Sequence, residues 1–111
     1  MDIDEFVKNN DIIIFVQVDV KNKRFNIIKM DIGLESYDLF EQLILFSNTE
    51  TLLRNISGEL LPRIWTQGNT TCIVSQPNSE QIVVLFYDKC SDAKDNYFYA
   101  KELDVQLKEI F

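Results

Sequence analysis

Alternation of apolar and polar residues predicts a hairpin near the start of the chain. Residues 11–20 and 25–32 both alternate, and the short polar run between them is typical of a turn, so we expect two antiparallel strands. In the first strand one face is apolar along its whole length, which predicts that this face lies in the core. Its residues are Ile12, Ile14, Val16, Val18 and Val20.

Three more strands are expected in the second half of the chain. Residues 63–67 and 70–75 flank a Gly-Asn pair, which is a signal for a two-residue hairpin turn. Residues 81–87 are almost continuously apolar, as is typical of a central strand covered on both faces.

Three segments change to the three- and four-residue spacing of an amphipathic helix. Residues 2–9 predict a short first helix and residues 93–111 a longer last one. Residues 35–57 are also helical in pattern, but the capping-box spacing at 47–50 leaves open one kinked helix or two. We therefore predict an α+β fold in which a five-stranded antiparallel sheet is flanked by helices. The expected order is helix, strand, strand, helix, strand, strand, strand, helix, with residues 1–111 as a single domain.

The predicted middle helix has more apolar surface than one sheet can cover. A helix on a sheet needs one apolar stripe, whereas residues 39–46 are apolar on more than one side, which suggests a second burial surface. Trp65, the single tryptophan, points away from Ile64 and Thr66 and shares its strand face with Arg63. It is either a core or edge aromatic, or an interface anchor, since tryptophan and arginine are common in binding hot spots.

Composition narrows the classes of function. The 111 residues are 46% hydrophobic and 26% charged, which is ordinary for one globular domain. The apolar runs have strand length and the start of the sequence is acidic, so we expect a cytoplasmic protein that does not enter a membrane. The formal net charge of −7 disfavours nucleic acid; it favours a basic partner, or serves solubility alone.

The residues that most often carry catalysis are missing or isolated. The chain has no histidine, which excludes Ser-His-Asp and Cys-His arrangements, and its three glycines form no phosphate-binding loop. Asp88, Asp92 and Asp95 lack the central glycine and closing glutamate of a calcium loop. Cys72 and Cys90 are more typical of free thiols than of a disulfide or a metal site. We therefore predict no catalytic site, metal or cofactor, and a protein that works by binding another protein.

The order of elements resembles the roadblock family, the dynein-light-chain-like domains with a profilin-like fold. The resemblance covers most of the chain and rests on the apolar helix at 37–56, the hairpin at 63–75, and the strand at 82–88 with its following loop and helix. The chain differs from the family in its shorter first helix and in bulky residues where the family's middle helix has small ones. These residues are Leu39, Phe40, Leu45 and Phe46.

The resemblance implies a homodimer, formed side by side through the middle helix and the adjacent edge strand. It also implies a scaffold or regulator of a small Ras-like GTPase that does not itself hydrolyse nucleotide. The expected interface residues are Phe40, Ile44, Leu45, Phe46, Arg63 and Trp65.

Two readings from other functional classes stay open. The first is an immunity or inhibitor protein that neutralises a basic toxin, for which the acidity is the evidence. The second is a small acidic secretion chaperone, which also combines a twisted sheet with helices and dimerises. A small molecule bound in an apolar pocket would instead favour an enzyme.

Overall fold

The structure is a computed structural model that describes residues 2–31, 33–46, 48–58, 61–88 and 92–111. Within these residues, five strands form one antiparallel sheet in the order β2-β1-β5-β4-β3. The strands are β1 (Ile14–Asp19), β2 (Arg24–Met30), β3 (Arg63–Gln67), β4 (Thr70–Asn78) and β5 (Gln81–Asp88). The helices are α1 (Ile3–Asn9), α2 (Asp38–Phe40) continuing into the π-helical segment η1 (Glu41–Leu45), α3 (Thr49–Ile56) and α4 (Ala93–Ile110).

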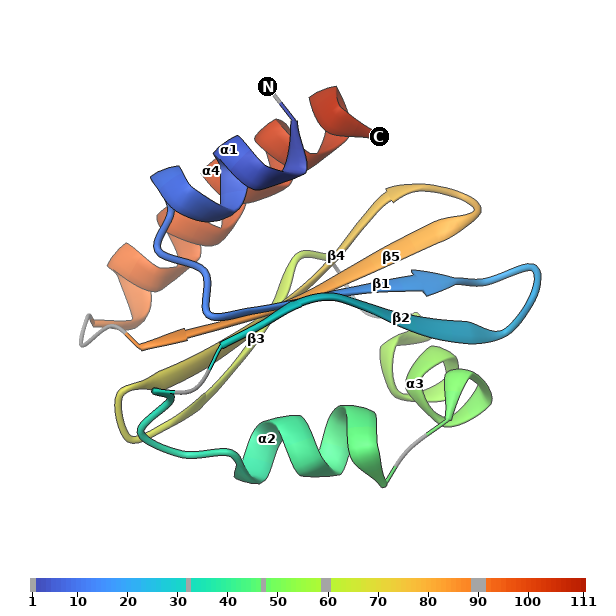
Figure 1. The fold of residues 1–111 in the computed structure, drawn as a ribbon, viewed down its shortest axis with the longest axis horizontal. Helices are drawn as coiled ribbons and strands as arrows, with labels where there is room; N and C mark the ends of the chain where they lie inside the picture. The colour runs from blue at the N-terminus through green and yellow to red at the C-terminus, as the bar shows by residue number, and fades with distance from the viewer. Residues whose placement is uncertain (1, 32, 47, 59–60, 89–91) are drawn as a thin grey trace.

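The helices cover opposite faces of the sheet (Figure 1). α1 and α4 lie on one face, where Asn10 Nδ2 donates a 3.2 Å hydrogen bond to Gln106 Oε1 and so joins the end of α1 to α4. α2 and α3 lie on the other face. The predicted α+β fold, its antiparallel sheet and its order of elements are therefore confirmed. No helix in the described part of the chain is both long and apolar enough to cross a bilayer.

Each face of the sheet has its own apolar cluster. Val84 and Phe86 of β5 belong to the cluster under α2 and α3, whereas Val83 and Leu85 belong to the cluster under α1 and α4. All four side chains are fully buried, since β5 lies at the centre of the sheet with a helical layer on each side. This confirms the prediction that the continuously apolar segment is a central strand covered on both faces.

The alternation predicted for the first hairpin is wrong at two positions. Ile12 precedes β1 and packs in the α1/α4 cluster, opposite to Ile14, because Asp11 takes a left-handed conformation (φ 53°) and the chain turns before the strand begins. In β2 a bulge interrupts the pairing: Phe15 lies opposite Lys29 and Val16 opposite Ile27, so the intervening residue of β2 is the extra one.

The middle segment forms two helical pieces rather than one. α2 and η1 end with an i→i+5 hydrogen bond of 2.8 Å from the Phe46 amide to the Glu41 carbonyl, as in a π-helix. Asn48 then has extended backbone, and its side chain caps α3 by accepting a 2.8 Å hydrogen bond from the Thr51 amide. Ser47, the first residue of the predicted capping box, lies outside the described residues.

Candidate protein-binding surfaces

A network of hydrogen bonds holds the start of α2 beside the end of β3. Gln67 Nε2, in β3, donates to Asp38 Oδ2, in α2, at 2.8 Å. The Ser36 amide donates to Thr70 Oγ1 at 3.0 Å, and this hydroxyl donates to Asp88 Oδ1 at 2.7 Å. The loop that enters α2 is thus tied to the ends of β4 and β5, and α2 contacts the edge strand β3.

Arg63 and Trp65 lie on the face of β3 that is turned toward α2. Arg63 pairs with Val74 and Trp65 with Cys72, and both partners belong to the α2/α3 cluster. The Arg63 guanidinium carbon lies 4.9 Å from the centroid of the Trp65 ring, which is a cation–π distance. Both side chains are half-buried, so Trp65 is an aromatic residue at the sheet edge that packs partly on the core.

The expected interface residues of the middle helix divide into two pairs. Phe40 and Ile44 are buried, and the Phe40 ring packs edge-on against Phe86 at 5.5 Å between centroids. Leu45 and Phe46 are 55% and 80% exposed. Phe40 and Ile44 thus complete the core of their own chain, because the helix lies flat on the sheet. Of these four side chains, Leu45 and Phe46 are the two that are exposed to solvent.

Cys72 and Asp92, two side chains of potentially reactive types, have structural roles. Cys72 is fully buried, and burial raises the pKa of its thiol, so the nucleophilic thiolate does not form near neutral pH. Asp92 caps α4 by accepting a 2.8 Å hydrogen bond from the Asp95 amide. No cluster of three or more potential metal ligands occurs among the residues that the structure describes. Cys90 lies outside them.

Two further groups of apolar residues are exposed. Ile27, Ile28 and Met30 are 44–50% exposed on the edge strand β2. Three others lie on α4, away from its buried stripe: Tyr97, Phe98 and Val105. The helical spacing of the last segment predicts that Tyr97 belongs to its buried stripe with Ala100, but this is wrong, since Tyr97 is 50% exposed. The sequence does not reveal that the β2 residues are exposed, because an edge strand and a buried strand share the same two-residue alternation.

Among solved structures, the fold is similar to that of MglB from Myxococcus xanthus. The match has a TM-score of 0.53 and 14% sequence identity, and it covers 96% of this chain and 89% of that chain. At this identity the likeness shows the fold alone. No protein-family model and no curated protein sequence matches the chain. The chain therefore has the roadblock-like α+β fold that its order of elements predicts.

Proposed function

We propose that residues 1–111 act as one non-catalytic protein-binding domain that forms a homodimer and scaffolds or regulates a small Ras-like GTPase. The observation that carries the proposal is the exposure of Leu45 and Phe46 at the end of the helix that contacts the edge strand β3. The roadblock-like fold supports it, since members of that family commonly act on such GTPases as dimers.

The dimer contact would combine the α2/η1 helix with β3. β3 has a strand neighbour on one side only in the described sheet, so its other edge can pair with β3 of a second copy. Trp65 and Arg63 lie on this strand and face the helix, and Leu45 and Phe46 are the exposed apolar residues at the end of the helix. Complete burial of one large apolar side chain stabilises a contact by about 1.5–3 kcal/mol. Burial of Phe46, which is 80% exposed in the single chain, would therefore favour association.

The first test is the oligomeric state of the full chain. Sedimentation velocity at micromolar concentration should give a dimer whose dissociation constant rises when the exposed apolar side chains are replaced. A monomer at these concentrations would contradict the dimer.

The second test separates the proposed function from the other classes of partner. The protein is used to retain partners from its native lysate, and each identified partner is then purified and titrated against it. A folded GTPase that binds more tightly in one nucleotide state, GDP or a non-hydrolysable GTP analogue, supports the proposal. A basic enzyme whose affinity falls steeply with salt would favour an immunity protein, and an unfolded effector segment would favour a chaperone.

A further inference from the structure

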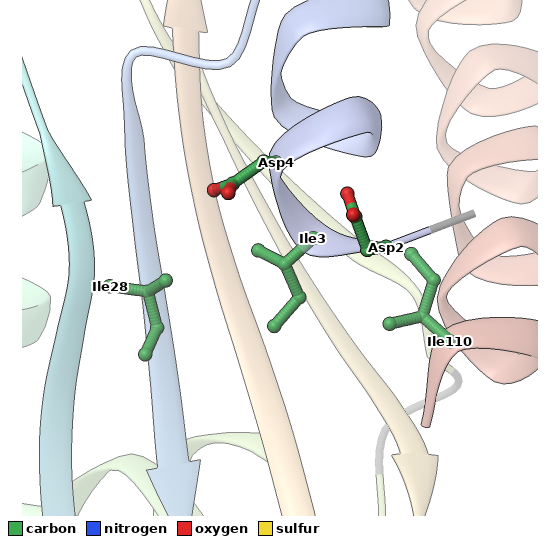
Figure 2. Close-up of a pocket in the computed structure, with 5 residues that line it drawn as sticks. All are labelled: Asp2, Ile3, Asp4, Ile28 and Ile110. Carbon is green, nitrogen blue, oxygen red and sulfur yellow. The ribbon is translucent and has the colours of Figure 1, made fainter.

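A groove lies at the edge of the sheet opposite to β3. It has a volume of about 520 Å³ and is formed by the start of α1, the end of α4 and β2. Figure 2 shows Ile3 between Ile28 and Ile110, with the carboxylates of Asp2 and Asp4 beside them. The groove therefore combines three aliphatic side chains with two acidic ones.

The strand that borders this groove is open to pairing. β2 is the end strand of the described sheet, so one of its backbone edges has no strand partner there. Ile27 and Met30 pair with Val16 and Ile14, which puts them on the α2/α3 side, whereas Ile28 lines the groove on the α1/α4 side. The edge strand thus exposes apolar surface on both of its faces, and an added strand would cover both at once.

The charges around the groove select the kind of strand that fits. In the described part of the chain, neither Asp2 nor Asp4 forms an ion pair; Asp2 uses Oδ1 to cap α1 through the Glu5 amide at 2.8 Å. Lys29 faces the same side of the sheet, but its ammonium is paired with Asp31 at 3.2 Å. With a net charge of −7 for the whole chain, this face attracts cations.

We propose that β2 binds an extended segment of another protein in which lysine or arginine alternates with aliphatic residues. Successive side chains of a strand point to opposite faces. The aliphatic ones would cover Ile27 and Met30. The basic ones would lay their methylene stems on the groove isoleucines and bring their charges to Asp2 and Asp4.

A second copy of this chain is a poorer occupant of the same edge, because a β2–β2 contact would bring the positive charges of Arg24 and Lys29 in the two copies toward one another. The proposed surface is also separate from the α2/β3 dimer contact, since β2 and β3 are opposite ends of the described sheet. The inference therefore stands whether or not the proposed GTPase function is correct.

The test uses a fluorescein-labelled peptide with blocked ends, in which lysine alternates with isoleucine or valine, titrated with the full chain by fluorescence anisotropy. We expect saturable binding that weakens with added salt, and loss of binding when the lysines are replaced by glutamate or when the peptide backbone is N-methylated at alternate residues. Absence of saturable binding up to millimolar protein, or equal binding of the glutamate peptide, would overturn the proposal.

Two substitutions locate the site on the protein. Asp4→Asn removes a charge at an exposed position and should weaken binding about fivefold. Ile28→Lys puts a cation into the groove and should weaken it at least about tenfold. The matched control is Val105→Lys, a similar change at an exposed position on α4, which should leave the affinity within about twofold.

Melting temperatures identify variants that fail to fold. If Ile28→Lys fails to fold, the peptide affinity of Asp4→Asn still tests the site. Equal effects of Ile28→Lys and Val105→Lys in folded proteins would refute the site. Phe46→Lys, at the proposed dimer contact, should bind the peptide like the unsubstituted protein. A loss of peptide binding in that variant would place the peptide on the other surface and overturn the inference.

Discussion

Thr70 Oγ1 donates a 2.7 Å hydrogen bond to Asp88 Oδ1 and joins the start of β4 to the end of β5. The same carboxylate accepts a 2.9 Å hydrogen bond from the Glu35 amide through Oδ2, and the threonine hydroxyl accepts one of 3.0 Å from the Ser36 amide. Two side chains at the sheet end therefore satisfy the backbone of the loop that enters α2. This pair therefore helps to hold α2 beside β3, together with the hydrogen bond from Gln67 to Asp38.

Thr70→Val should destabilise the fold by about 1–3 kcal/mol, because a buried site keeps its shape but loses the hydroxyl that serves Ser36 and Asp88. Urea denaturation followed by circular dichroism measures the change in the free energy of unfolding. Thr66→Val, at an exposed position of β3, is the control and should change stability by less than about 0.5 kcal/mol. Equal losses in the two variants would show that the hydrogen bonds are not the cause.

Phe46→Lys should shift the proposed homodimer toward monomer, because it replaces an 80% exposed apolar ring with a charge. Sedimentation velocity over a concentration series measures the dissociation constant, which we expect to rise at least about tenfold. The matched control is Phe98→Lys on α4, 58% exposed and on the other face of the sheet. If Phe98→Lys dissociates the dimer and Phe46→Lys does not, the contact lies on α4.

The Cys72 thiol should resist alkylation in the folded protein. Burial raises its pKa, so the thiol is neutral and inaccessible, whereas the unfolded chain exposes a thiol with an ordinary pKa. In a Cys90→Ser variant, iodoacetamide at pH 8 should label Cys72 at least about a hundredfold more slowly in buffer than in urea. Rapid labelling in buffer would mean that β4 opens readily.

Stability should also fall in alkaline solution because of this thiol. The unfolded thiol ionises near its ordinary pKa of 9.0, while the folded one stays neutral, so the contribution is complete below that pH and declines as the pH rises above it. Denaturation midpoints between pH 7 and pH 10 measure the slope. Cys72→Ala is expected to reduce the slope, while also lowering stability at pH 7 by leaving a small cavity. An unchanged slope would assign the alkaline loss to other groups.

Asn48→Ala should destabilise the protein by about 1 kcal/mol, because the Thr51 amide loses its capping acceptor at the start of α3. The free energy of unfolding in urea measures this effect. Asn55→Ala, an exposed position within the same helix, is the control and should be neutral or slightly stabilising, since alanine has the higher helix propensity. A larger loss at Asn55 would contradict the role of the cap.

The pattern of apolar and polar residues is enough to predict which segments are strands and helices, and therefore the class of fold. The run at 81–87 predicts a strand covered on both faces because such a strand can contain few polar residues, and β5 has this environment. The stripe of α4, which includes Ala100, Leu103 and Leu107, likewise follows from a period that belongs to the helix alone. These features depend on residues that are close together in the sequence, so the sequence alone is enough to predict them.

Which apolar residues remain exposed depends instead on how the elements pack in three dimensions. Phe40 and Phe46 belong to the same helical segment, yet one lies in the core and the other on the surface, because the helix turns between them and Phe46 points to a side that the sheet does not cover. Ile12 changed faces through the turn at Asp11. The groove brings Ile3, Ile28 and Ile110 together from three elements. The spacing of apolar residues reflects the helix or strand in which they lie, whereas their burial depends on which segments, distant in the sequence, pack against each face.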